Sequence, residues 1–297
     1  MSEIVITIFT PTYNRSHLIT NLYDSLTQQT YKNFEWLVFD NGTDNTHDII
    51  ENLKQKKPDF PIIYHKTSNS SERGINRAMN KAVKMASGHL FMKVDDDDIL
   101  TSDALEKIIL WESTILPEEK KSFAGVSGLR AHKDGTIIGG YGKGENIYID
   151  ATNLQRNKFR LEGDKAEAYY TNVLISYGPL PEIDGEYYTW EGMLYDRIAA
   201  AGLKIRWFKD IIYYTEYLPG GATSQVYKAC EENFKTYTLL ISERIGFKDA
   251  DLIYKLKGLR RLFKTARKLG LSYSDVKSSF NCSRLFLFGG YCLSIIT

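Results

Sequence analysis

Apolar runs and segments of helical periodicity alternate along the first hundred residues of this chain. Four runs predict β-strands: Glu3 to Thr10, Phe34 to Asp40, Ile62 to His65 and His89 to Val94. Between them, apolar residues recur at helical spacing over residues 16–28, just after Asp44, and over residues 74–86. This alternation predicts βαβ units, and therefore an α/β fold with a mostly parallel sheet flanked by helices.

The second half of the chain has a less regular pattern. Helices are predicted over Leu105 to Ile115 and Leu194 to Gly202. Strands are predicted over Phe123 to Leu129, Asn172 to Tyr177, Lys204 to Phe208 and Ile211 to Thr215. From about residue 224 the periodicity becomes helical, which predicts a helical tail over residues 224–297.

Polar loops follow three of the predicted strands, at Pro11 to Arg15, Asp40 to Asp44 and Asp95 to Asp98. Because the carboxyl ends of parallel strands meet at one edge of a sheet, these loops should cluster there. Four adjacent carboxylates repel one another, so Asp95 to Asp98 either hold a cation or form a solvated turn that caps the next helix. Oxygen ligands of this kind suit Mg²⁺ or Mn²⁺.

Composition narrows the class of protein. The apolar content of 43% allows a sizeable core, and the formal net charge of +1 gives no bias toward nucleic acid. Cys230, Cys282 and Cys292 are too widely spaced for a disulfide framework or a zinc site, which favours a reducing compartment. We see neither a signal-peptide pattern nor an apolar run of 18 residues, so we expect a cytoplasmic location.

The order of four motifs resembles the family 2 glycosyltransferases of GT-A fold. The motifs are Pro11 to Arg15, Asp40 to Asp44, Arg73 to Asn80 and Asp95 to Asp98, and the resemblance returns at Trp190-Glu191. It implies an inverting hexosyl- or N-acetylhexosaminyltransferase with a nucleotide-sugar donor, most simply UDP-linked, and Mn²⁺ or Mg²⁺ as cofactor. Residues 1–223 would form the transferase domain, with a nucleotide-binding half over 1–115 and an acceptor-binding half over 116–223. A saccharide or lipid-linked acceptor and a role in surface polysaccharide or glycoconjugate synthesis are implied.

The resemblance also implies roles for the acidic run. Asp97 would be the main metal ligand, as the later acid of the family's Asp-x-Asp pattern. Asp95 or Asp96 would hold the ribose or reach the metal, and Asp98 would help to cap the next helix. The family pattern has a small residue where Asp96 stands, so the division of roles among these carboxylates stays open.

The other nucleotide-binding candidates come from the same resemblance. Tyr13 would stack on the base, in a pocket shaped by Pro11, Thr12 and Arg15, or else be a core aromatic. Asp40 would accept a hydrogen bond from the ring N–H of the base, or else begin an Asx turn at Asn41-Gly42. Arg73 would pair with a phosphate or the base, or else form a surface ion pair. These candidates are read from the motifs as they stand in the chain.

Glu191 is the candidate catalytic base, because an inverting transfer needs a carboxylate to take the proton of the acceptor hydroxyl. Gly192 follows it where the family usually has a second acid, and Asp184 and Glu186 are nearby alternatives. Trp190 is a candidate sugar platform for the acceptor, or else a packing residue at a helix start.

A basic segment in the tail has two possible interpretations. Residues 255–268 contain seven Lys or Arg residues and no acid, and Leu252, Leu256, Leu259, Leu262, Phe263 and Ala266 form an apolar stripe at helical spacing. Such a helix either contacts an anionic membrane, placing the protein at the inner face of the cytoplasmic membrane, or packs on the body through its stripe. The tail as a whole could also dimerise.

Two other functions fit parts of the pattern. A sugar-phosphate nucleotidyltransferase also combines an α/β domain with acidic metal ligands, but it needs a glycine-rich phosphate loop where this chain has Pro11 to Arg15. A non-catalytic carbohydrate-binding protein on a transferase fold is the other, and the presence of Asp95, Asp97 and Glu191 argues against it.

Overall fold

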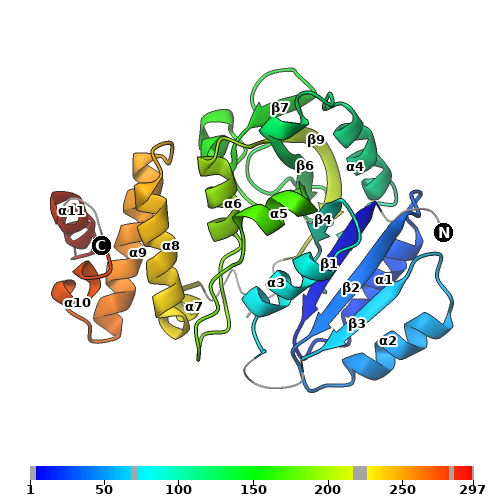
Figure 1. Cartoon of the computed structure of the whole chain (residues 1–297), viewed down its shortest axis with the longest axis horizontal. Coiled ribbons are helices and arrows are strands. Elements are labelled where there is room, and N and C mark those ends of the chain that lie inside the picture. Colours follow the sequence, from blue (N-terminus) through cyan, green and yellow to red (C-terminus); the bar gives the residue numbers. More distant parts are fainter. Residues whose placement is uncertain (1–4, 68–71, 217–225, 281–283, 296–297) are drawn as a thin grey trace.

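A single mixed sheet with helices on both faces forms the body of the protein, and a group of helices lies to one side (Figure 1). The computed structural model describes residues 5–67, 72–216, 226–280 and 284–295. Its sheet has nine strands in the order β3-β2-β1-β4-β8-β6-β9-β5, with β7 paired to β9. The strands are β1 (Ile6–Thr12), β2 (Phe34–Asp40), β3 (Ile62–Lys66), β4 (Leu90–Lys93), β5 (Ile99–Leu100), β6 (Phe123–Ala131), β7 (Tyr148–Ala151), β8 (Lys165–Tyr170) and β9 (Lys204–Tyr214).

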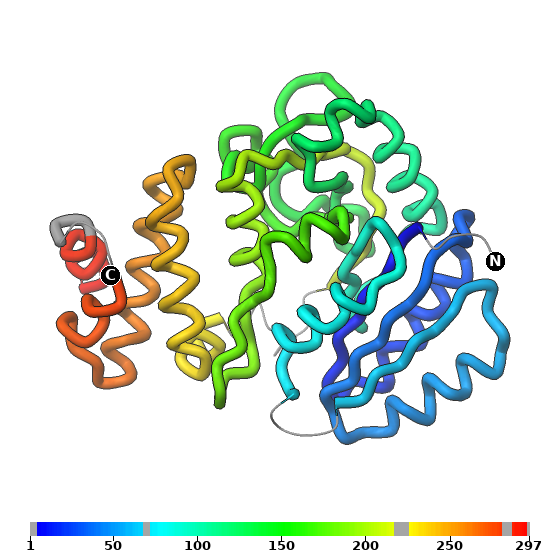
Figure 2. The backbone as a smooth tube through the Cα atoms, in the orientation of Figure 1, coloured from blue at the N-terminus to red at the C-terminus, as the bar shows by residue number. Residues whose placement is uncertain are grey.

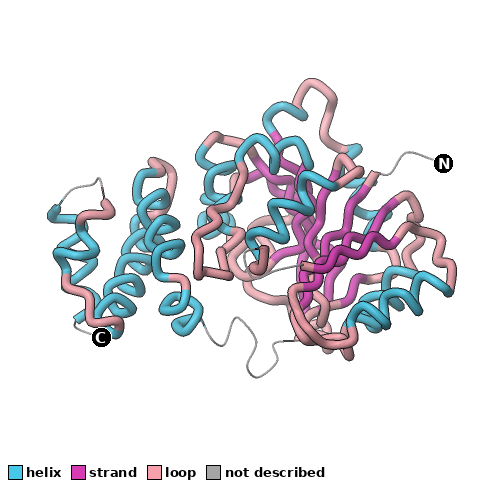
Figure 3. The backbone as a smooth tube through the Cα atoms, turned by 60° about the horizontal axis from the view of Figure 1, so that its bottom comes forward, coloured by secondary structure: helices cyan, strands magenta, loops and turns pink. Residues whose placement is uncertain are grey.

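In the described ranges, six α-helices and two 3₁₀ turns accompany the sheet, and five helices follow it. The first group is α1 (Ile19–Thr27), α2 (Thr46–Gln55), α3 (Ile75–Met85), α4 (Ala104–Ser113), α5 (Thr171–Tyr177) and α6 (Gly192–Ala200), with η1 (Lys120–Ser122) and η2 (Asn153–Phe159). The second is α7 (Val226–Glu232), α8 (Phe234–Gly246), α9 (Leu252–Lys268), α10 (Tyr273–Lys277) and α11 (Arg284–Ile295). Figure 3 shows the helices on both faces of the strands.

The predicted parallel arrangement is confirmed for the first four strands, since β3, β2, β1 and β4 pair in parallel. Beyond β4 the sheet is mixed. Strand β8 was not predicted, and it pairs antiparallel with both β4 and β6. The two short strands predicted between Lys204 and Thr215 are one strand, β9. The prediction of mostly parallel pairing therefore describes β1 to β4, since β5 pairs antiparallel with β9.

The segment Asn172 to Tyr177 was predicted as a strand, and this was wrong, because it lies in α5. Its apolar residues Val173, Leu174 and Tyr177 also fit helical spacing, and so short a run does not distinguish the two. Tertiary contacts decide the outcome. Where β8 gives way to α5, Thr171 donates its backbone N–H and its hydroxyl to the carbonyls of His89 and Gly88, at 2.8 and 2.6 Å.

The two faces of the sheet are covered by different helices, and alternate residues of each strand point to opposite faces. In β4 and the residue after it, Leu90, Met92 and Val94 belong to the core cluster that includes α1, α2 and α4. Phe91 belongs to the cluster on the other face, with α3, α5 and α6. By the same alternation Lys93 points toward α6, and its ion pair with Glu191 confirms that direction.

The helical tail packs through the apolar stripe of α9. Leu259, Leu262, Phe263 and Ala266 are buried, and α9 contacts α8 and α11 most extensively. In Figure 2 these helices form one group, yellow to red, at the far side from the amino-terminal strands. Of the two interpretations of the basic segment, the structure supports packing, here on neighbouring helices of the tail, because the stripe is covered from Leu259 to Ala266, although Leu252 at its start is exposed. Among the described residues, no helix is both long and apolar enough to cross a bilayer.

Candidate active site

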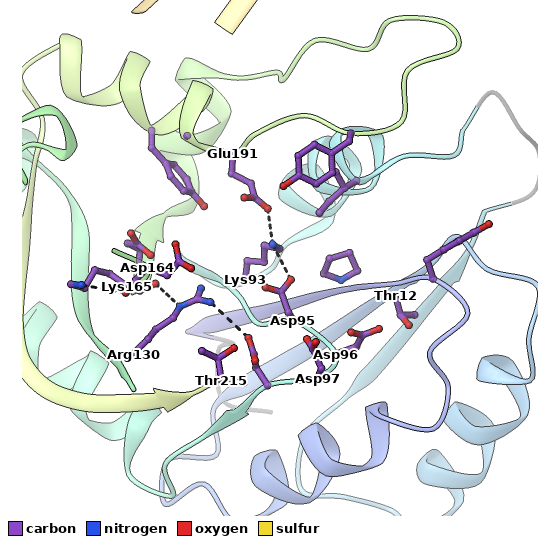
Figure 4. A pocket seen from close by; sticks show the side chains of 18 of the residues that line it. Thr12, Lys93, Asp95, Asp96, Asp97, Arg130, Asp164, Lys165, Glu191 and Thr215 are labelled. Atoms are coloured by element: carbon purple, nitrogen blue, oxygen red, sulfur yellow. Dashed lines mark hydrogen bonds and ion pairs between the residues drawn. The ribbon is translucent and has the colours of Figure 1, made fainter. Parts of the chain in front are cut away.

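A cavity of about 1080 Å³ opens at the carboxyl ends of β1 and β4, where the predicted polar loops meet. It is lined by nine of the residues predicted for the site, from both halves of the body: Pro11, Thr12, Tyr13, Arg15, Arg73, Asp95, Asp96, Asp97 and Glu191. Figure 4 shows the acidic run on one side of this cavity and Glu191 on the opposite side. The expected convergence of the loops at one edge of the sheet is thus confirmed.

Asp96 and Asp97 share a counter-ion. Nη2 of Arg15 lies 2.7 Å from Oδ1 of Asp96 and also contacts Oδ2 of Asp97. Asp96 is only 2% exposed, and burial raises its pKa to about 7, outweighing the attraction of Arg15. Asp97 is more open, with 19% of its side chain exposed. Asp97 is therefore the member of this pair that is better placed to meet a ligand.

Asp98 has a different environment from its three neighbours. It is 3% exposed, its Oδ2 accepts a hydrogen bond of 2.7 Å from the hydroxyl of Tyr213, and Arg130 lies 3.7 Å from the same oxygen. Burial raises the pKa of Asp98 to about 6. The expectation that Asp98 caps the next helix is wrong, since the N-cap of α4 is Asp103. Asp98 instead joins the acidic loop to β9.

Lys93 connects the two sides of the cavity. Its Nζ lies 2.9 Å from Oδ1 of Asp95 and 2.7 Å from Oε1 of Glu191, and these two ion pairs are drawn in Figure 4. Although burial lowers it, the pKa of Lys93 stays well above its usual range because of the two carboxylates. The same ammonium helps to keep the pKa of Asp95 below its usual range, against the effect of burial. Glu191 itself is the N-cap residue of α6.

Tyr13 and Arg73 contact one another at the other end of the cavity. The guanidinium of Arg73 lies 4.4 Å from the ring centre of Tyr13 and 5.3 Å from that of Tyr187, so the cation stands between two aromatic rings. Tyr13 is 46% exposed, which excludes the alternative of a core aromatic. One face of the Tyr13 ring is thus covered by a cation that can also pair with phosphate.

Two predicted site residues do not line the cavity. Asp40 is fully buried, and its carboxylate accepts hydrogen bonds from Gly42 N–H, Tyr64 hydroxyl and Lys66 Nζ, each at 2.7 Å. The bond from Gly42 is the Asx turn of the alternative interpretation, and a base could reach Asp40 only if another donor gave way. Trp190 packs its ring against Tyr188 and Tyr237, so the packing interpretation holds for it too.

The alternatives to Glu191 are also accounted for by the structure. Asp184 is fully exposed, lies 3.6 Å from Arg77, and does not line the cavity. Glu186 is buried, and its two oxygens accept the backbone N–H groups of Lys235 and Thr236 in the first turn of α8, both at 2.8 Å. Glu186 thus caps a helix of the tail, and among the three carboxylates only Glu191 faces the cavity.

Sequence reasoning missed seven charged residues that line the cavity: Lys93, Arg130, Arg156, Asp164, Lys165, Glu167 and Glu216. The alternation of β4 could have drawn attention to Lys93, a lone charge in an apolar strand. Glu167 lies on β8, which was not predicted. Within the described residues its one ion pair is a distant one of 4.0 Å with Arg156, and burial raises its pKa despite the attraction of Arg156 and Arg130. Glu167 therefore presents a carboxylate with unused acceptor capacity to the cavity.

The carboxylates suit a metal ion that is shared with a substrate. Among the described residues, no group of three or more His, Cys, Asp and Glu side chains is arranged to hold an ion. A hard divalent ion, however, is often held by one or two carboxylates together with phosphate oxygens of a substrate. Asp97 and Asp95 both line the cavity and offer oxygen donors of this kind. The residues present therefore fit an ion whose remaining ligands come from a bound diphosphate.

Comparison with known proteins agrees with this geometry. Residues 7–111 match the family described as glycosyl transferase family 2. A GalNAc(5)-diNAcBac-PP-undecaprenol beta-1,3-glucosyltransferase of Campylobacter jejuni is 32% identical over 124 residues, which are 41% of this chain and 37% of that protein. The match thus spans well under half of that relative.

Two solved structures share the fold across most of the chain. S. aureus TarS 1–349 in complex with UDP-GlcNAc has a TM-score of 0.61 at 20% identity and covers 89% of this chain and 73% of its own. The mannosyltransferase PcManGT of Pyrobaculum calidifontis, in complex with GDP-Man and Mn²⁺, has a TM-score of 0.60 at 15% identity and covers 98% and 86%. These likenesses show that the chain has the GT-A fold, and its residues 7–111 are similar to the family 2 glycosyltransferases.

Proposed function

We propose that the protein is an inverting glycosyltransferase that moves a sugar from a nucleotide diphosphate sugar to a hydroxyl group of an acceptor. The observation that carries the proposal is the placement of Asp95 to Asp97 and Glu191 on opposite sides of one cavity, joined by Lys93. A donor held along the acidic side would present its anomeric carbon to an acceptor that lies beside Glu191. Each group that the reaction needs then comes from a different wall.

The donor is bound, in this proposal, by residues at the Tyr13 end of the cavity. The nucleobase stacks on Tyr13, and Arg73 turns from the aromatic rings toward a phosphate. A UDP-linked donor is the first expectation, supported by the likeness to a structure solved with UDP-GlcNAc. Asp97, with Asp95, would hold Mn²⁺ or Mg²⁺, which when bound offsets the negative charge that grows on the departing diphosphate. A fold neighbour solved with Mn²⁺ supports this choice of ion.

The chemistry at the acceptor side involves Glu191. The acceptor oxygen forms a bond to the anomeric carbon while the bond from that carbon to the diphosphate breaks, and its electrons leave with the diphosphate. Glu191 takes the proton of the acceptor hydroxyl. Attack from the side opposite the leaving group inverts the anomeric configuration.

A lipid-linked or saccharide acceptor is the natural extension of this proposal, and so is a role in surface polysaccharide or glycoconjugate synthesis. The name of the C. jejuni relative includes an undecaprenol diphosphate acceptor, which supports a site of action close to a membrane. We propose residues 1–223 as the transferase unit and residues 224–297 as a helical extension, whose helix α8 contacts α6. The transferred sugar, hexosyl or N-acetylhexosaminyl, would be selected by the part of the cavity around Glu167.

A panel of nucleotide sugars, assayed for release of the nucleotide with and without acceptor and Mn²⁺, tests the proposal. Glu191→Gln should lower turnover about 10²–10⁴-fold, the usual effect of removing a general base. The affinity for UDP should stay within about twofold of the wild type, because Glu191 faces the acceptor and not the nucleobase. Asp184→Asn is the matched control and should keep full turnover, since this exposed carboxylate lies outside the cavity.

The outcomes distinguish between candidate bases and between the alternative functions. Persistent turnover in Glu191→Gln would make Glu167 the next candidate base. Binding of UDP without transfer or hydrolysis of any donor by the wild type would favour the non-catalytic carbohydrate-binding alternative. The match of residues 7–111 to glycosyl transferase family 2 speaks against the nucleotidyltransferase alternative.

A further inference from the structure

Lys93 is a charged residue in a strand that otherwise supplies core side chains. Strand β4 runs parallel to β1, with Lys93 beside Phe9, and its other residues Leu90, Phe91 and Met92 are buried. Only 16% of the Lys93 side chain is exposed. A buried ammonium destabilises a fold unless it is paired, so its partners decide what it contributes.

The two partners of Lys93 come from elements that are far apart in the chain. Asp95 belongs to the loop that follows β4, on the donor side of the cavity, and Glu191 is the N-cap of α6, on the acceptor side. One ammonium group, at 2.9 and 2.7 Å, therefore fixes the distance between the two sides. No other residue that Figure 4 labels has dashed contacts to both of these carboxylates.

The contact also distinguishes the two oxygens of Glu191. Lys93 engages Oε1, which is otherwise buried without a hydrogen-bond donor. No hydrogen bond or ion pair joins Oε2 to another side chain or backbone group in the part of the chain that the structure describes. A carboxylate held at one oxygen keeps the other available as a proton acceptor in a defined direction.

We propose that Lys93 is a positioning residue for the transfer, which holds Oε1 of Glu191 so that Oε2 faces the acceptor hydroxyl. This inference rests on the proposed function and adds the residue that sets the place of the base. Lys93 does not exchange a proton in the reaction. The proton passes from the acceptor hydroxyl to Oε2. Because Lys93 also pairs with Asp95, it keeps Glu191 at a fixed position relative to the donor side.

Three variants test this role. Lys93→Met removes the charge while keeping most of the side-chain volume, Lys93→Arg keeps the charge with a different reach, and Lys93→Met/Glu191→Gln combines the losses. Lys107→Met is the matched control, because Lys107 also bridges two carboxylates, Asp103 at 2.9 Å and Asp210 at 3.8 Å, outside the cavity. It should retain wild-type kcat and wild-type UDP affinity.

Lys93→Met should lower kcat about 10²-fold, the scale expected for a displacement of a reacting group by about 1 Å. UDP affinity should stay within about threefold, and Lys93→Arg should restore part of the lost kcat. The double variant should be no slower than Glu191→Gln alone, because Lys93 acts only through the base. Non-additivity of this kind is the readout that a purely structural lysine would not give.

Several results would overturn the inference. These are a kcat for Lys93→Met within twofold of the wild type, a fall in UDP affinity that matches the fall in kcat, and effects of Lys93→Met and Glu191→Gln that multiply in the double variant. Should Lys93→Met lose the circular dichroism spectrum of the wild type, Lys93→Gln, which also removes the charge, carries the test, and a kcat within twofold of the wild type there would overturn it. A wild type that turns over no donor is a separate result, which refutes the proposed function itself.

Discussion

The junction between the helical tail and the segment that carries Glu191 depends on Glu186. This side chain is 8% exposed, and its two oxygens accept the backbone N–H groups of Lys235 and Thr236, each at 2.8 Å. These N–H groups belong to the first turn of α8, where no helical carbonyl can satisfy them. Next to Glu186, the backbone N–H groups of Tyr187 and Tyr188 donate to Oδ1 of Asn233, at 2.8 and 2.9 Å.

Glu186→Gln keeps the shape of the side chain and changes its chemistry at this junction. The amide can accept from only one of the two N–H groups, so one hydrogen bond to a charged group is lost, which costs about 1.5–3 kcal/mol. Loss of the negative charge at the amino terminus of α8 adds about 0.3–1 kcal/mol. We expect a decrease of about 2–4 kcal/mol in the free energy of unfolding of the tail and its junction.

Urea unfolding followed by circular dichroism at 222 nm measures this change. Glu118→Gln is the matched control, because Glu118 is exposed and remote from these contacts, and it should stay within about 0.5 kcal/mol of the wild type. A Glu186→Gln protein as stable as Glu118→Gln would refute the reasoning and would show that the capping of α8 does not hold the junction. Turnover should fall as well, since the segment from Glu186 to Glu191 would lose an attachment.

Three further predictions concern the donor site and the tail. Asp97→Asn should abolish transfer and weaken UDP binding in Mn²⁺ with an unchanged circular dichroism spectrum, and EDTA should inactivate the wild type; full activity in either case would exclude the metal role of Asp97. Tyr13→Ala should cost about 1–3 kcal/mol of UDP affinity by calorimetry, the scale of base–aromatic stacking, whereas Tyr141→Ala, outside the cavity, should not; equal affinities would remove Tyr13 from the site. Because the apolar stripe of α9 is buried from Leu259 to Ala266, binding to phosphatidylglycerol vesicles should be mainly electrostatic, with about 1 kcal/mol for each cation in reach and sensitivity to salt. Changing Arg260, Arg261, Lys264 and Lys268 to Glu should then abolish sedimentation with the vesicles, and binding that survives high salt would mean that another surface is responsible.

Local sequence patterns were enough to predict the strands and helices of the amino-terminal half of the fold. The strand Phe34–Asp40 lies where it was predicted, and the helices α1 and α3 begin and end within about three residues of their predicted bounds. In this half each strand and helix has its own periodicity, and parallel connection follows from their alternation. The convergence of Tyr13, Arg15 and Asp97 on one cavity follows in turn, because parallel strands place the loops after them at one edge.

The sequence by itself thus determined the α/β class, the edge at which the site forms, and the residue types that the site contains. Only the tertiary structure decided which of those residues face the cavity. Asp40 was turned inward by donors on a neighbouring strand, and Glu186 was taken up by a helix of the tail. Lys93 acquired its place from a carboxylate far along the chain. Contacts between distant segments depend on how helices and strands pack, and the hydrophobic periodicity within one segment cannot predict them.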